Sequence, residues 1–418
     1  MRAILDRRHI ILGLLFMAKS IPLVFFTMGL PVILRLEGLP LETIGFLQLT
    51  GLPYLLKFLW APLLDRNGRQ ASHYKVWILG TGLASALLFT ILSGQTPQAH
   101  IWDIGLCILA SSAVVSTQDI AINALYIKLL AFEERGAGSS TKVAALNLGS
   151  ILGSGAFLLL YNHTGWQATL LIMAGTAILP LLLLPLLNEE ECPQMPQNSG
   201  QWLAIPGFFR TRGMTPWFTL AVCNSIGISA VFFLIKPFLI DCGVPADTAA
   251  FLVGFYGMGI AALTAMLTGG IHFQHFLLNR RRAYLGGVLT CALAAGLFIP
   301  AALFPQAHAP LYAAIAMLNI ALTIHTVVSA TLIMDFSRQG NESLDYSLQM
   351  TGIHLGGMAM ASFSGVVAAR TGYLLFFVLQ TGISLVMFFV SMALFKESWI
   401  TKKSDPAVDG HGTTRRTA

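Results

Sequence analysis

Long apolar runs constrain this sequence more than any other feature. Each is close to the roughly 20 residues that a helix needs to cross a bilayer. Charged residues make up 11% of the chain, against about 25% in soluble proteins, which excludes a soluble globular protein. The sequence therefore predicts an all-α integral membrane protein, embedded in a lipid bilayer, with twelve transmembrane helices. The twelve runs cover residues 9–34, 44–64, 75–93, 102–127, 142–161, 167–187, 216–240, 249–269, 284–304, 310–334, 348–369 and 374–395.

The distribution of lysine and arginine predicts the topology. Basic residues gather at the N-terminus, in the central polar segment, in the C-terminal tail and in the loops between even-numbered and odd-numbered runs. One such loop has Lys128, Arg135 and Lys142, whereas the opposite side has Arg35 and Arg370. Because basic loops stay in the cytoplasm, we expect both termini to be cytoplasmic. The net charge of +6 is then a topology signal, and no nucleic-acid partner is predicted.

A polar segment divides the chain into six runs plus six. We expect an N-terminal six-helix bundle over residues 1–187, a cytoplasmic linker over 188–214, a C-terminal six-helix bundle over 215–395 and a cytoplasmic tail over 396–418. The linker contains proline and glycine residues and lacks an apolar run of spanning length.

The two halves resemble each other in sequence. Gly38–Leu47 matches Gly243–Leu252 at an offset of 205 residues, and Thr164–Trp166 echoes Thr371–Tyr373 in the corresponding later turns. Repeated halves bracket a site near the bilayer midplane and rock against each other to give alternating access. The sequence therefore predicts two pseudo-symmetric bundles around a central path. Since each half supplies one wall of that path, we expect a monomer to suffice.

Ionisable residues inside the runs mark a candidate site, because charge is expensive in lipid. Lys19 lies about ten residues into the first run, roughly 15 Å deep. Lys57 and Asp119 lie at similar depth in the second and fourth runs. We expect Asp119 to pair with Lys57 or with Lys19. The functional interpretation is a substrate or proton site, with Asp119 as proton acceptor; the alternative is an ion pair that fixes helix packing.

The second half offers two histidines within its runs. His325 and His354 can titrate near neutral pH, which makes them candidates for substrate binding and for proton coupling, respectively. The alternative for each is a hydrogen-bonded helix contact.

The loop after the second run carries a recognisable signature. It reads Ala-Pro-Leu-Leu-Asp-Arg-Asn-Gly-Arg-Gln over residues 61–70, which resembles the G-x-x-x-D-R-x-G-R-R loop of the major facilitator superfamily. Alanine replaces the first glycine, and glutamine replaces the last basic residue. In that family the loop is a conformational latch, so the resemblance implies a gating role for Asp65, Arg66, Gly68 and Arg69. The alternative is a plain basic loop.

Other stretches indicate which branch of the superfamily the chain resembles. Lys57–Pro62 (KFLWAP) and Ser116–Asp119 (STQD) are similar to motifs of the AmpG-related branch. Asp345–Gln349 (DYSLQ) is similar to the D-Y-T-L-Q of the RhtX/FptX siderophore permeases.

The resemblance implies a secondary-active importer in a bacterial inner membrane. It would carry a ferric siderophore from periplasm to cytoplasm, be proton-driven, and have a functional link to an outer-membrane siderophore receptor. Lys19 would then offer charge to this small-molecule substrate, and Gln118, Asn224 and Asn319 would donate hydrogen bonds. The alternatives are an AmpG-type muropeptide permease, or an exporter of a siderophore or another small molecule.

A further class of function is a membrane enzyme, sensor or scaffold. The sequence has no H-E-x-x-H, G-x-S-x-G or G-x-x-x-x-G-K-[ST] motif, and its five cysteines lack metal-type spacing. We therefore expect no enzymatic activity, no cofactor and no metal site. Substrate-dependent accumulation in vesicles would separate a carrier from this class.

Overall fold

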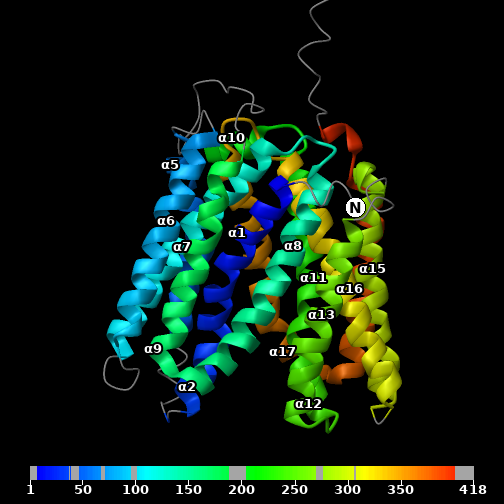
Figure 1. The fold of residues 1–418 in the computed structure, drawn as a ribbon. Coiled ribbons are helices and arrows are strands. Elements are labelled where there is room, and N and C mark those ends of the chain that lie inside the picture. The colour runs from blue at the N-terminus through cyan, green and yellow to red at the C-terminus, as the bar shows by residue number, and fades with distance from the viewer. Residues whose placement is uncertain are drawn as a thin grey trace, which may run out of the picture.

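The protein is all-helical in the computed structural model (Figure 1). Nine segments of the described chain are long and apolar enough to cross a membrane, and a shorter apolar helix covers Leu49–Leu59. This matches the predicted all-α membrane protein. The described residues are 7–36, 38, 47–66, 71–95, 101–187, 204–269, 276–305 and 307–400.

The first half forms the crossings up to the polar segment. The second crossing is built of short pieces, with Pro53 and Pro62 within the first two positions of its two α-helical turns, because proline cannot donate a backbone hydrogen bond. In chain order the elements are α1 (Arg7–Val24), η1 (Phe25–Gly29), α2 (Leu30–Leu36), η2 (Gln48–Gly51), α4 (Leu52–Leu56), η3 (Lys57–Leu59), α5 (Ala61–Asp65), α6 (Ala71–Ser93), α7 (Ile101–Leu129), α8 (Arg135–Ile151), η4 (Leu152–Ala156), α9 (Phe157–Ile178) and η5 (Leu179–Leu186).

The second half repeats this plan with longer helices. Its elements are α10 (Ala204–Arg210), α11 (Met214–Asp241), α12 (Ala246–Phe251), η6 (Leu252–Tyr256), α13 (Gly257–Thr268), α15 (Arg280–Leu303), α16 (His308–Asp335), α17 (Glu342–Leu394) and η7 (Glu397–Trp399). The expected linker therefore includes a short helix, α10, while its residues 188–203 lie outside the described part. Residues 401–418 of the expected tail also lie outside it.

Two glycines divide the longest helical segments. Gly165 interrupts α9 and Gly372 interrupts α17, each with φ of 77°. Dividing the chain there, and counting the shorter helix Leu49–Leu59, gives twelve crossings in the described chain. Gly38 and Gly243, the other matched glycines of the repeat, have φ of 82° and 81°. Side chains disfavour this left-handed region, so the two halves turn at equivalent places with the same residue type.

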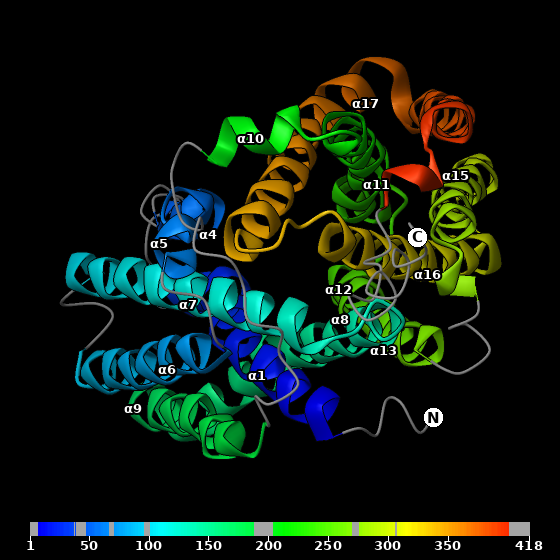
Figure 2. The ribbon, with the colours of Figure 1, turned by 90° about the horizontal axis from the view of Figure 1, so that it is seen from above.

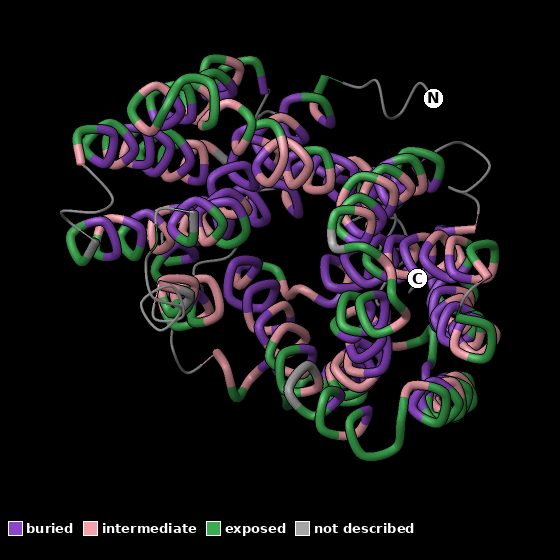
Figure 3. Tube along the Cα trace, turned by 90° about the horizontal axis from the view of Figure 1, so that it is seen from below, coloured by how far each residue is buried: buried purple, intermediate pink, exposed green. Residues whose placement is uncertain are grey.

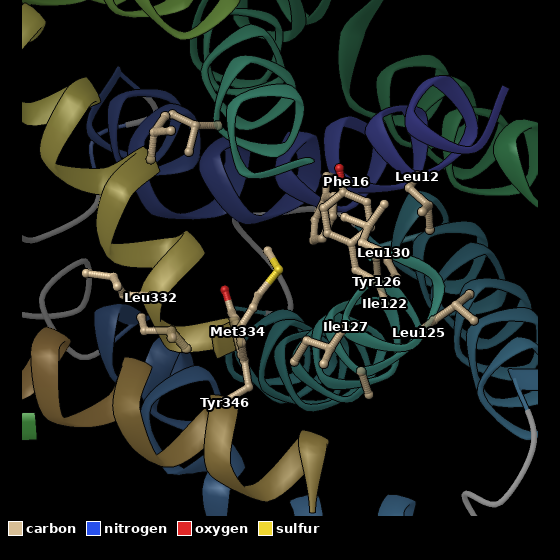
Figure 4. Packing of buried hydrophobic residues seen from close by; sticks show 14 of the residues in the cluster. Leu12, Phe16, Ile122, Leu125, Tyr126, Ile127, Leu130, Leu332, Met334 and Tyr346 are labelled. Carbon is tan, nitrogen blue, oxygen red and sulfur yellow. The ribbon is translucent and has the colours of Figure 1, made fainter. Parts of the chain in front are cut away.

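The halves pack together at one end of the bundle, here called the termini side because α1 begins there and α17 ends there (Figures 1 and 2). The largest apolar cluster draws on both halves, and Phe16, Tyr126, Leu332, Met334 and Tyr346 belong to it (Figure 4). Two other clusters are each confined to one half. Buried residues line the interior of each bundle and exposed ones lie on its outer side (Figure 3), as expected for helices that face lipid.

Candidate substrate site

A cavity of about 420 Å³ lies between the two halves. The first half lines it with Leu55 and Lys142, among others, and the second half with His325, Tyr346 and His354. This volume is within the range of small-molecule sites. The cavity is therefore the candidate site for a transported solute.

A buried charge cluster lies beside the cavity wall. Asp119 on α7 accepts a hydrogen bond from the Nζ of Lys19 on α1 and another from the Nζ of Lys57 on η3, the latter at 2.5 Å. The three side chains are each no more than 3% exposed. Both pairings that the sequence left open are present together, so one carboxylate bridges three elements of the first half.

Tyr54 connects this cluster to the second half. The Nζ of Lys57 lies 4.1 Å from the centre of the Tyr54 ring, and that of Lys19 lies 5.6 Å from it. The ring stacks on His354 of α17, with 6.2 Å between ring centres. An aromatic face attracts a cation, so Tyr54 holds the two lysines on one side and meets a residue of the cavity wall on the other.

Lys142 is a site residue that the sequence did not reveal. Its Nζ donates to the Oδ1 of Asn123 at 2.7 Å and to the hydroxyl of Tyr346 in the other half. The Nδ2 of Asn123 donates to the backbone carbonyl of Asp119 at 2.7 Å. We assigned Lys142 to a basic loop, but α8 begins at Arg135, which places Lys142 two turns inside a helix. The small residues before it, Gly136–Ser140, were the signal for that close helix packing.

The cluster contains more basic than acidic side chains among the described residues. Lys19, Lys57 and Lys142 are buried with Asp119 as the carboxylate that the described residues place among them. Burying a charge without a counter-charge is costly. A site with this balance favours a ligand that brings negative charge.

Three residues expected to bind substrate lie away from the cavity. Gln118 faces α6, where a Cβ at Gly82 would lie 3.1 Å from its Nε2. The Nδ2 of Asn224 donates to the hydroxyl of Tyr284 at 2.5 Å, and that of Asn319 to the Ile315 carbonyl at 2.9 Å. The Asn224 contact joins two helices of the second half and the Asn319 contact lies within one turn of α16, so both amides have hydrogen-bond partners without a substrate.

The two histidines do reach the cavity. His325 is 7% exposed and has its Nε2 3.5 Å from the Oγ of Ser329. His354 lines the same cavity. Both remain candidates for contact with a solute.

The predicted gating loop is only partly described. Asp65 ends α5 and accepts hydrogen bonds from the backbone N–H groups of Ser343 and Leu344 at the start of α17, at 3.0 and 2.9 Å. Tyr74 donates to the same carboxylate at 2.9 Å. Burial, with the nearby Glu342 carboxylate, raises the pKa of Asp65 to about 7, against the opposing effect of its hydrogen-bond donors. Asp65 therefore joins the two halves. Arg66 is exposed, and Gly68 and Arg69 lie outside the described residues.

A second contact closes the termini side. Asp335 at the end of α16 accepts from the Nη1 of Arg135 at 2.8 Å and from the Nε of Arg280 at 2.6 Å. The Nη2 of Arg280 also donates to the Phe132 carbonyl at 2.8 Å. Sequence reasoning treated both arginines as topology signals and did not single out Asp335. With Asp65, this ion triad holds the halves together on the termini side of the cavity.

Known proteins support this architecture. Residues 10–337 match the profile of the Major Facilitator Superfamily. Over 304 residues the chain is 30% identical to the anhydromuropeptide permease of Escherichia coli, an alignment that covers 70% of this chain. The chain spans about 60% of that relative's length. A putative transporter AmpG 4 of Rickettsia felis is 23% identical over 94% of this chain and 97% of its own.

Solved structures show the same fold. A bacterial homologue of the iron transporter ferroportin, in an outward-facing state, superposes with a TM-score of 0.70 at 14% identity, over 93% of this chain and 98% of its own. The human organic anion transporter TETRAN superposes with a TM-score of 0.66 at 14% identity, over 92% and 99%. The profile, the relatives and the fold agree, and the chain belongs to the Major Facilitator Superfamily, in its AmpG-like branch.

Proposed function

We propose that the protein is a secondary-active importer of an anionic muropeptide, carried from the periplasm across a bacterial inner membrane into the cytoplasm. The observation that carries this proposal is the excess of basic over acidic side chains at the wall of the inter-half cavity, where Lys142 lies beside the Lys19–Asp119–Lys57 cluster. The similarity to the anhydromuropeptide permease supports the substrate class. The superfamily and the fold point to a transporter rather than an enzyme.

The expectation of a siderophore substrate rested mainly on the DYSLQ stretch, Asp345–Gln349, whose side chains make structural contacts within the protein. Asp345 accepts from Arg338 at 2.7 Å, and the Oε1 of Gln349 accepts from the Nε1 of Trp217 at 2.7 Å. Both contacts fix α17 within the second half. The AmpG relatives favour a muropeptide as substrate. They give no support to the expected link to an outer-membrane siderophore receptor.

The closed termini side suits uptake from the opposite side. If the termini are cytoplasmic, as the basic loops predict, Asp65 and Asp335 seal the cavity from the cytoplasm. Rocking of the halves would then break these contacts and release the solute inward. His354 faces the cavity, whereas two lysines hold Asp119, so His354 becomes our first candidate for proton coupling and Asp119 the second.

Uptake of a labelled solute tests the proposal. Cells that lack their own muropeptide permease, with and without this gene, would receive tritiated anhydro-N-acetylmuramyl tripeptide or a ⁵⁵Fe-loaded siderophore. We expect gene-dependent accumulation of the muropeptide that a protonophore abolishes. Accumulation of the ferric siderophore alone, with expression confirmed, would contradict the proposal and restore siderophore import.

A further inference from the structure

We propose that Lys142 binds a carboxylate of the transported solute, and that this carboxylate replaces the hydroxyl of Tyr346 as a hydrogen-bond acceptor of the lysine. This inference rests on the proposed function, because it assigns the group of that same site that recognises the anion. It also assigns a role to Tyr346, whose hydroxyl accepts the hydrogen bond from Lys142 when no solute is bound.

Among the described residues that line the cavity, Lys142 is the one lysine or arginine. The other ionisable side chains of that wall are His325, Tyr346 and His354, and the remainder is chiefly aliphatic with a few hydroxyl groups. The lysine is 5% exposed, so water screens its charge weakly. A single cation in such a wall recognises one anionic group on a largely uncharged body.

The bonding of Lys142 leaves room for such a ligand. An ammonium group has three N–H donors, and the described residues supply acceptors for two of them, Asn123 and Tyr346. Both acceptors are neutral. A carboxylate adds the attraction of opposite charges, in a weakly screened site, to the hydrogen bond that a neutral acceptor offers, so a carboxylate can displace the phenol.

The carboxylate of Asp119 is paired with lysines other than Lys142. Each of its carboxylate oxygens accepts from a different lysine, Oδ1 from Lys19 and Oδ2 from Lys57. Lys142 reaches Asp119 only through the amide of Asn123, which bonds the aspartate backbone. No carboxylate among the described residues bonds Lys142 directly, and the cavity is where a ligand can place one beside it.

The exchange would weaken a contact between the halves close to the gate. Tyr346 lies in the first turns of α17, two and three residues after Leu344 and Ser343, whose N–H groups bind Asp65. The Lys142–Tyr346 bond joins α8 of one half to this same end of α17. A ligand that prefers the state without this bond shifts the equilibrium toward opening.

Binding to the purified full-length protein tests the assignment. The probes are anhydro-N-acetylmuramyl tripeptide, the same compound with its carboxyl groups amidated, and a ferric tricarboxylate siderophore, each titrated by calorimetry. The variants are Lys142→Met, Lys142→Arg and Tyr346→Phe. Lys236→Met, at an exposed lysine of α11, is the matched control.

We expect Lys142→Met to weaken binding of the acidic muropeptide at least tenfold, since a hydrogen bond to a charged group is worth that much, and to leave the amidated form unchanged. Lys142→Arg keeps the charge and should retain most of the affinity. Tyr346→Phe removes the competing phenol and should tighten binding a few-fold, which a variant that simply loosens the fold would not do.

The outcomes separate this inference from the proposed function. Equal binding of acidic and amidated muropeptide, unaffected by Lys142→Met, would overturn the Lys142 assignment and leave muropeptide import standing. Binding of the tricarboxylate alone, lost in Lys142→Met, would overturn muropeptide import and support the carboxylate site. Binding of neither acid by the unaltered protein would overturn both.

Discussion

Asp119 is the residue on which the buried charge cluster depends. Replacing it by asparagine keeps the shape but leaves Lys19 and Lys57 without a counter-charge. Removing one partner of a buried ion pair costs about 3–5 kcal/mol. We therefore expect Asp119→Asn to lower the melting temperature of the detergent-solubilised protein and to abolish uptake.

The matched control for this prediction is Asp247→Asn, at an exposed aspartate near the start of α12. It should leave the melting temperature within the error of the unaltered protein. Asp119→Asn with undiminished stability and full uptake would show that the aspartate is needed neither as a counter-ion nor as a proton acceptor.

Asp65 makes closure of the termini side depend on pH. Its pKa is about 7 in the closed form, whereas an exposed aspartate has a pKa near 3.9. The closed form therefore binds the proton more tightly, and the stabilisation that this gives is present at low pH and is lost as pH rises through about 7. We expect the open fraction to grow between pH 5.5 and pH 8.

Spin labels across the gate measure that fraction. Cysteines at Glu133 and Leu278, which lie in different halves next to the Arg280–Phe132 contact, would be labelled in a background without native cysteines. The distance distribution should broaden as pH rises. Asp65→Asn cannot ionise and should give a distribution independent of pH; a pH response that survives this substitution would assign the effect to another group.

The sequence predicts a site residue where a charged side chain lies within an apolar run, because burial is unusual for a charged residue. Lys19, Lys57 and Asp119 stand out because a charge within an apolar run needs a partner. Lys142 did not, because it is the first residue of its apolar run, where basic residues also report topology. Asp335 did not, because it ends α16 and lies outside the apolar runs. The contacts of Asn224 and Gln118 depend on which face of a helix meets which neighbour, and a single sequence does not give that.

Among the elements, α1 and η4 pack closely through a glycine of η4. A Cβ at Gly153 would lie 2.5 Å from the carbonyl oxygen of Ile21, so Gly153→Ala must push the helices apart. Overpacking of this kind costs about 1–3 kcal/mol. We expect a lower melting temperature and reduced uptake, whereas Gly175→Ala, where nothing lies within 4 Å of the added Cβ, should change neither.

The helical crossings themselves follow from hydropathy, and the element boundaries follow less well. Apolar length predicts where the chain crosses, because lipid demands backbone hydrogen bonds within each segment. It does not predict the π-helical turns at Phe25–Gly29, Leu152–Ala156 and Leu252–Tyr256, which depend on contacts between crossings. The start of α8 was misplaced because its first two turns are polar and small rather than apolar.

At the scale of the whole molecule, the Asp335 ion triad and the Asp65 hydrogen bonds are separate contacts that help to hold the termini side closed. Asp335 is bound by Arg135 and Arg280 from different halves, with its side chain fully buried at 0% exposure. Removing its charge by Asp335→Asn breaks both ion pairs while Asp65 stays in place. We expect the open population to rise at least tenfold, measured with the Glu133 and Leu278 spin labels.

Asp241→Asn provides the comparison for this change. Asp241 accepts from Tyr373 at 2.5 Å within the second half, away from the termini side. Its substitution should leave the spin-label distances unaltered. An Asp335→Asn protein with the distances of the unaltered one would mean that Asp65 and the apolar cluster suffice for closure.

The cluster also sets an order of events during biosynthesis. Lys19 and Asp119 are 100 residues apart, so at about 5–20 residues per second the ribosome makes the lysine at least several seconds before its partner. Over that interval the first helix carries a central lysine that costs about 2.5–3.5 kcal/mol to insert. We expect the first helix to stay at the insertion machinery until the fourth arrives, so a nascent chain halted before Asp119 should cross-link there rather than to lipid.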